Sequence, residues 1–168
     1  VSNIAGNRTY VPALISNLES MRVINTDAGN SATMNVTGLA GLTSLESSSA
    51  VSAVNYTNIS STDTTLKASA NVGAVDFAFK AAATLGETTA INLNLTSNAG
   101  NVTVNTTGAG IDSATITATG INTGGSYIGA AADLKSLTVK GTGSLVIAAA
   151  DMTALTTMNA ADNAGGVT

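Results

Sequence analysis

The fold of this chain is decided by the segment Leu134-Lys135-Ser136-Leu137-Thr138-Val139-Lys140-Gly141, because the chain repeats its pattern. An apolar residue is followed by two polar residues, then by an apolar residue, and two positions later by a small or apolar one. The pattern returns at 155–162, and copies lie at 18–25 and, more weakly, at 42–49. Each copy is typical of a turn that leads into a short strand with alternate side chains pointing inward. A strand unit repeated at a near-constant spacing predicts a solenoid.

Two interleaved series of apolar residues carry this spacing through the chain. The first series is Val23, Leu45, Leu66, Leu93, Ile116, Leu137 and Met158, and the second is Met34, Tyr56, Phe77, Val102, Ile128 and Val146. The steps of the first series are similar in length, except for a longer step from Leu66 to Leu93. The interval between Phe77 and Leu93 contains the Ala-rich run 78–86, which predicts a local insertion with a short helical turn.

Apolar and polar residues alternate within the segments around these centres, as in Ile91-Asn92-Leu93-Asn94-Leu95. Such alternation is typical of a sheet with one buried and one solvated face. We therefore predict an all-β chain that forms a right-handed parallel β-helix with coils of about 21–24 residues. A β-sandwich of short strands is the alternative. The double periodicity and the absence of Asn-Gly and Asp-Gly hairpin turns favour the β-helix.

The whole chain, residues 1–168, is expected to form a single β-solenoid domain. Residues 1–17 are the least regular and are expected to be an irregular or capping segment, where the single proline, Pro12, suits an edge. The chain lacks an initiator Met, and Gly165-Gly166-Val167-Thr168 resembles the start of another strand. We therefore expect it to be a fragment of a longer protein.

The composition argues against several classes of function. A net charge of −4 with six scattered basic residues gives no electrostatic footprint for nucleic acid. The absence of His and Cys removes Ser-His-Asp, Cys-His and zinc chemistry. Glu19 and Glu46 fall at similar coil positions, but a carbohydrate-active enzyme is the least favoured class for a chain without Trp. We expect no enzymatic activity, and no apolar run is long enough for a transmembrane segment.

Calcium is the one cofactor for which the sequence offers candidate ligands. Asp27 and Asp112 lie beside Gly- and Asn-containing turns, and Asp162 lies near the C-terminus, so these three are weak candidates for metal ligands. A calcium ion needs about six to eight oxygen ligands at one point. An aspartate that caps its own turn is the competing interpretation.

The repeats at 18–25, 34–45 and 134–162 resemble the Thr/Ala/Gly/Asn-rich β-solenoid regions of large secreted bacterial proteins. The most similar in style are the RTX-related surface-layer proteins of the Caulobacter and Campylobacter type, together with giant adhesins. The resemblance implies an extracellular protein of the bacterial cell surface that acts as a structural component of an S-layer lattice. Its partners would be copies of itself or neighbouring domains of the same chain. The alternative that it implies is a stalk or passenger segment of a secreted adhesin.

Members of these families often bind calcium through tandem Gly-Gly-x-Gly-x-Asp nonapeptides. This chain has a single imperfect approach to that motif, Gly108-Ala109-Gly110-Ile111-Asp112, and no tandem array. The resemblance therefore gives little support to calcium binding within these 168 residues.

Overall fold

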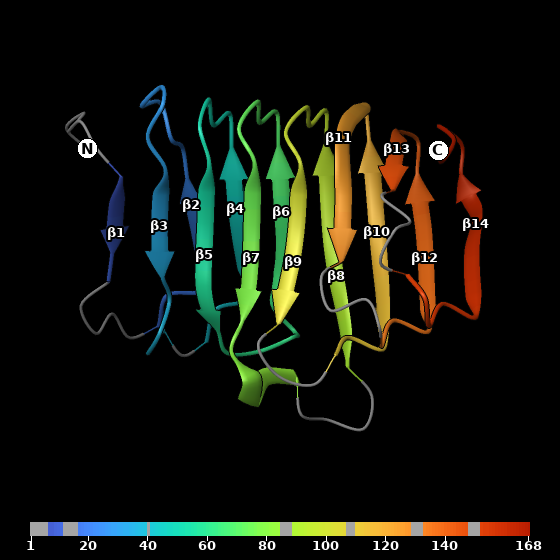
Figure 1. The fold of residues 1–168 in the computed structure, drawn as a ribbon, viewed down its shortest axis with the longest axis horizontal. Helices are drawn as coiled ribbons and strands as arrows, with labels where there is room; N and C mark the ends of the chain where they lie inside the picture. Colours follow the sequence, from blue (N-terminus) through green and yellow to red (C-terminus); the bar gives the residue numbers. More distant parts are fainter. Residues whose placement is uncertain are drawn as a thin grey trace.

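The chain folds as a parallel β-solenoid in a computed structural model. The structure describes residues 7–11, 17–39, 41–84, 89–106, 110–128, 133–147 and 152–168. Two sheets of seven strands face each other, and the chain alternates between them (Figure 1). Every strand pairing among the described residues is parallel, so the predicted β-solenoid is confirmed and the β-sandwich is not.

We call the two layers the odd sheet and the even sheet after their strand numbers. The odd sheet contains β1 (Arg8–Tyr10), β3 (Ala32–Asn35), β5 (Val54–Ile59), β7 (Val75–Phe79), β9 (Val102–Thr106), β11 (Ile121–Ile128) and β13 (Ser144–Ile147). The even sheet contains β2 (Ser20–Val23), β4 (Ser44–Ser48), β6 (Thr65–Ser69), β8 (Ala90–Thr96), β10 (Ser113–Thr119), β12 (Ser136–Gly141) and β14 (Thr157–Asn163). In Figure 1 the odd strands run downward in front, the even strands run upward behind them, and the chain advances from left to right. This sense of coiling is right-handed, the usual hand for parallel crossovers.

The core lies between the two sheets and is built from stacked apolar columns. In β8 the side chains of Ile91, Leu93 and Leu95 are buried, whereas Asn92 is exposed, as the alternation predicts. Tyr56 of β5 stacks on Phe77 of β7 with ring centroids 5.3 Å apart. Identical inward positions of successive coils thus meet in columns, which removes apolar surface from water at every coil.

The predicted period is confirmed, although several predicted strand centres are displaced by two or three residues. The first series is correct from Leu45 to Ile116 and again from Leu137 to Met158, and the second is correct from Met34 to Phe77. The corrected pairs are Met21 with Leu45, Ile116 with Val139, Ala114 with Leu137, Phe77 with Val104, Val104 with Ile128, and Gly125 with Val146. A shift of two residues keeps the same side chains inward, so alternation alone does not determine which inward residue pairs with which.

The longest coil carries the predicted insertion. Leu66 pairs with Leu93, which confirms the longer step between these two residues. This coil contains the short 3-10 helix η1 (Ala81–Thr84) below β7 in Figure 1. Residues 85–88, which include the end of the predicted run, lie outside the described residues. Part of the segment 1–17, which was expected to be irregular or capping, forms a strand. Arg8–Tyr10 form the edge strand β1 beside β3. Residues 1–6 and 12–16 lie outside the described residues.

Candidate functional site

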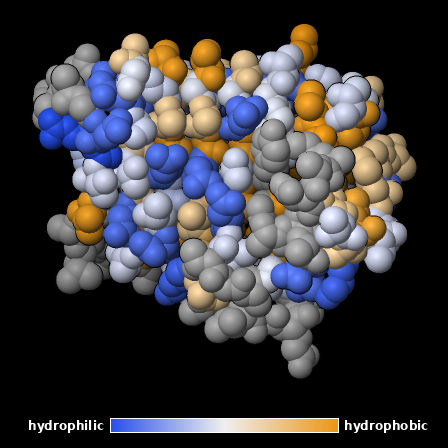
Figure 2. Space-filling view, in the orientation of Figure 1, coloured by the Kyte–Doolittle hydropathy of each residue, from blue (hydrophilic) through white to orange (hydrophobic). Residues whose placement is uncertain are grey.

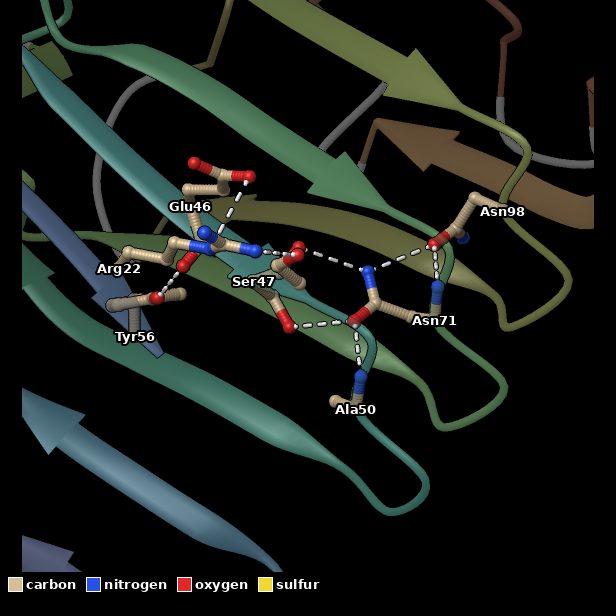
Figure 3. A network of polar contacts seen from close by, with 8 residues as sticks. Arg22, Glu46, Ser47, Ala50, Tyr56, Asn71 and Asn98 are labelled. Atoms are coloured by element: carbon tan, nitrogen blue, oxygen red, sulfur yellow. Dashed lines mark hydrogen bonds and ion pairs between the residues drawn. The ribbon is translucent and has the colours of Figure 1, made fainter. Parts of the chain in front are cut away.

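A column of buried side-chain amides follows the corner where the even sheet passes into the odd sheet (Figure 3). Asn71, Asn98 and Asn122 are at most 2% exposed. Each Oδ1 accepts a hydrogen bond from a backbone N–H of the preceding coil, with donors Ala50, Asn71 and Asn98 at distances of 3.0, 3.2 and 3.0 Å. The amides therefore replace the strand hydrogen bonds that the backbone gives up when it bends at the corner.

Asn71 shows how completely the amide groups are used. Its Nδ2 donates to the carbonyl of Ser47 at 3.0 Å and to Oδ1 of Asn98 at 2.9 Å. Its Oδ1 also accepts the hydroxyl of Ser47 at 3.0 Å. A buried amide with all of these partners fixes the corner in one conformation and has no group left to act on a substrate.

A column of close-packed glycines lies two residues beyond these asparagines. A Cβ on Gly100 would lie 2.0 Å from the carbonyl oxygen of Gly73, and a Cβ on Gly124 would lie 2.0 Å from the carbonyl oxygen of Gly100. The recurring signal in the sequence is Asn-x-Gly, at 71–73, 98–100 and 122–124, and again at 163–165. This signal is not apparent from the sequence alone, because the repeat becomes visible only when coils of unequal length are aligned.

The amide column is less complete in the last coil. Asn163 donates from Nδ2 to the carbonyl of Gly143 at 3.0 Å, but its Oδ1 is buried and has no hydrogen-bond partner within the described residues. The corner between β12 and β13 contains no asparagine, so the continuous amide column runs from Asn71 to Asn122.

The three calcium candidates lie on different coils. Asp112 accepts hydrogen bonds from Nζ of Lys135 at 2.7 Å and from the backbone N–H of Thr89 at 2.9 Å. These two hydrogen bonds, with that of Lys135 the stronger influence, hold the pKa of Asp112 below its usual value. Its oxygens thus already stabilise the corner before β10, whereas Gly108 and Ala109 of the imperfect motif lie outside the described residues.

The other two candidates have local or exposed positions. Asp27 accepts a hydrogen bond from Nδ2 of Asn30 at 3.2 Å within its own turn, and Asp162 lies exposed in β14 opposite Lys140. The described residues contain no group of three or more acidic side chains that could hold a metal ion. Calcium binding stays a prediction.

Charged side chains on the outer face of the even sheet lie in one column. Arg22 lies opposite Glu46, with Nε and Oε1 3.7 Å apart, and its Nη2 donates to Oγ of Ser48 at 2.7 Å (Figure 3). The column continues through Lys67, Asn94, Thr117, Lys140 and Asp162. Glu19 lies three register positions before this column, beside Thr43. The idea that Glu19 and Glu46 share a column is therefore wrong, and they do not form a carboxylate pair.

Among the acidic side chains in the described part of the chain, Asp76 is the one whose pKa is raised. It lies half-buried on the outer face of the odd sheet, opposite Asn55 and Thr103. Burial raises the pKa of Asp76 above its usual value, and a hydrogen bond from Nδ2 of Asn105 at 2.5 Å opposes that rise. Its neighbours in the register are neutral, so Asp76 lacks the second titrating group of an acid–base pair.

We expect Asp76→Asn to raise the melting temperature at about pH 7 and to leave it unchanged at about pH 3. The pKa of Asp76 is higher in the folded chain than in the unfolded chain, so ionisation of this carboxyl disfavours the fold. The stability of the wild type therefore falls as the pH rises from the unfolded-state pKa through the folded-state pKa. The variant keeps an oxygen that accepts the hydrogen bond from Asn105. Thermal unfolding followed by circular dichroism measures the effect, and Asp63→Asn, at an exposed turn, removes the same charge as a control. A lower melting temperature at neutral pH would contradict the expectation.

No protein-family model matches this chain, and neither a curated protein nor a solved structure matches it. In the described part of the chain, no helix is long and apolar enough to cross a membrane. The fold and the corner columns define the class of the protein, a parallel β-solenoid whose buried polar groups maintain its own backbone.

Proposed function

We propose that this chain is a non-enzymatic structural component of a bacterial cell-surface lattice of the S-layer type, located outside the cell. The observation that carries the proposal is the way the described polar side chains are used. The buried asparagines pair with the backbone of neighbouring coils, as Asn71 does, and exposed hydroxyl and amide side chains form columns on the two sheets. A solenoid built in this way supplies length and a regular surface.

The outer face of the even sheet supports lateral packing. On either side of its charged column, two columns contain only hydroxyl and amide side chains: Asn92, Thr115, Thr138 and Asn159 form one, and Ser69, Thr96 and Thr119 form the other. Short side chains lose less conformational entropy than Lys or Glu when a neighbouring molecule covers them. Such a face suits packing between copies.

The outer face of the odd sheet has similar chemistry. Its outward residues include Thr33, Asn55, Asp76 and Thr103 in one column. Figure 2 shows that hydrophilic residues gather on this face over β5, β7 and β9. Two polar faces on opposite sides of one solenoid allow a copy to have neighbours on both sides, which a two-dimensional lattice requires. The resemblance of the repeats to surface-layer solenoids supports the same function.

The alternative is a stalk or passenger segment of a secreted adhesin. The stacking axis is the long axis of the molecule (Figure 1), and stacked coils of nearly constant length form a stiff spacer. In this alternative the solenoid holds a binding domain away from the cell and does not pack against copies of itself.

Electron microscopy of the purified chain, with and without added calcium, tests the proposal. We expect ordered two-dimensional sheets, with better order when calcium is present. A chain that stays dispersed under all conditions, while a longer parent protein binds cells or glycans, would favour the adhesin stalk. Turnover of a polysaccharide by the purified chain would contradict both structural functions.

A further inference from the structure

Large apolar side chains stay exposed along the corner where the even sheet passes into the odd sheet. In the described part of the chain, those exposed outside the first and last coils are Val51, Val72 and Ile121, at 46%, 70% and 71% exposed. All three lie two or three residues beyond the end of an even strand. Each has a further coil on both sides, so the exposure belongs to the lateral surface of the solenoid and not to its ends. Figure 2 shows hydrophobic residues along this upper edge.

Matching turns place the outward side chains of successive coils in one column. Three of these turns have a left-handed residue at the same position, with φ of 51°, 51° and 47° at Ser49, Ala70 and Ser97. Past the turn, one backbone N–H in each coil donates to a carbonyl of the preceding coil, at distances of 2.9, 2.9, 2.8 and 3.0 Å for Val51, Val72, Ala99 and Thr123. All four residues are exposed. We call this column, with Ile121 beside Thr123, the corner ridge.

The corner ridge is uncharged, unlike the opposite corner of the solenoid. The turns 49–53, 70–74, 97–101 and 120–124 contain no charged and no aromatic residue. The opposite corner, where the odd sheet passes into the even sheet, carries charges in the same coils, among them Asp63, Lys80, Asp112 and Lys135. Copies of a chain with a net charge of −4 repel one another where their charges meet. The ridge is a surface on which two copies meet without that repulsion.

The composition of the ridge also distinguishes a second copy from a lipid surface. Membrane-surface segments use Lys and Arg to bind anionic headgroups, and Trp and Tyr to lie at the interface. The four ridge turns contain none of these residue types. An exposed apolar row bordered by Ser and Thr is typical of a contact between proteins. A second copy of this chain is therefore the occupant that the ridge fits.

Large and small side chains alternate so that the ridge fits an antiparallel copy of itself. Let the second copy be turned by 180° about an axis that passes between Val72 and Ala99. Val72 of each copy then faces Ala99 of the other, and Val51 of each copy faces Thr123 and Ile121 of the other. At the centre the most exposed valine meets the smallest side chain of the ridge, which allows close packing and removes apolar surface from water.

We infer that two copies of this chain associate edge to edge through their corner ridges, antiparallel and related by a twofold axis. Both copies use the same surface, so the contact closes at a dimer. A row of four side chains is smaller than a standard interface of about 1,600 Å², so the contact is weak in dilute solution and forms at high local concentration. The inference concerns the corner and not the sheet faces, and it applies to a lattice and to an adhesin stalk alike.

Cysteine cross-linking tests the register, because the chain has no cysteine of its own. A mixture of Val72→Cys and Ala99→Cys should form a disulfide-linked heterodimer under mild oxidation, since a disulfide requires two Cα atoms within about 7 Å. Val51→Cys alone should cross-link at least about tenfold more slowly, because its two copies lie three coils apart in this arrangement. Ser60→Cys, exposed at the opposite corner, gives the rate of random collision. Mass spectrometry identifies the linked chains.

Val72→Lys tests the strength of the contact. The twofold axis places the substitution at two points of the interface, and we expect about hundredfold weaker dimerisation, about tenfold for each point. Sedimentation of the wild type over a concentration series, below the onset of larger assemblies, should show a mean mass that rises toward twice that of one chain. Ser60→Lys adds the same charge at the opposite corner and should associate like the wild type. Circular dichroism checks that both variants fold.

Equal cross-linking rates for the Val72→Cys and Ala99→Cys mixture and for Ser60→Cys would overturn the inference, as would equal dimerisation of Val72→Lys and Ser60→Lys. Fast cross-linking of Val51→Cys with itself would overturn the antiparallel arrangement. Binding of the wild type, but not of Val72→Lys, to phosphatidylcholine vesicles would identify a lipid surface as the occupant instead. A chain that cross-links at the ridge and never forms sheets would support edge pairing and contradict the lattice, and sheets without ridge cross-linking would do the reverse.

Discussion

Gly100→Ala is expected to lower the free energy of unfolding by about 3 kcal/mol, the upper part of the usual range for overpacking. The added Cβ would lie 2.0 Å from the carbonyl oxygen of Gly73. That oxygen belongs to the backbone of the adjacent coil and has little room to move, because a Cβ on Gly73 would itself lie 2.3 Å from the backbone of Ser52. Chemical denaturation followed by circular dichroism measures the loss.

Gly29→Ala is the control that separates close packing from backbone conformation. Gly29 has a φ of +89°, and a Cβ at this position would meet nothing within 4 Å in the described part of the chain. The substitution should therefore cost only the strain of a left-handed residue, about 1–2 kcal/mol. If the two substitutions were equally destabilising, close approach of the coils at Gly100 would not be the reason that glycine occupies that position.

Asn71→Ala is the second substitution with a large expected effect. It leaves the N–H of Ala50 and the carbonyl of Ser47 without the partners that the amide supplies at 3.0 Å each. A buried polar group without a partner costs about 1–3 kcal/mol, so the two groups together predict a loss of about 2–6 kcal/mol. Denaturant unfolding provides the measurement.

Asn92→Ala is the matched control for that substitution. Asn92 is also an asparagine of the even sheet, but its side chain lies exposed on the outer face of β8. Its replacement should change the free energy of unfolding by no more than about 0.5 kcal/mol. A similar small change for Asn71→Ala would show that the amide column does not stabilise the corner.

The candidate site was only partly predictable from the sequence. The turn beside Asp27 is predictable from its Gly and Asn residues, because such residues have local conformational preferences. The role of Asn71 is not predictable in this way, because its partners Ser47, Ala50 and Asn98 lie on neighbouring coils, far from it in the sequence. The partner of Asp112, Lys135, also lies on the next coil. Contacts between coils depend on how the coils align, which no local pattern records.

The stacked parallel fold follows from patterns that are already present in the sequence. The alternation in Ile91-Asn92-Leu93-Asn94-Leu95 and the spacing from Leu45 to Ile116 are properties of the chain that hold before any contact forms. The pairing of Met21 with Leu45, and of Val139 with Ile116, is seen only in the folded chain. The physical reason is that a strand can slip by two residues and still bury the same face. The lengths of the corners and the hydrogen bonds of Asn71, Asn98 and Asn122 select one of these registers.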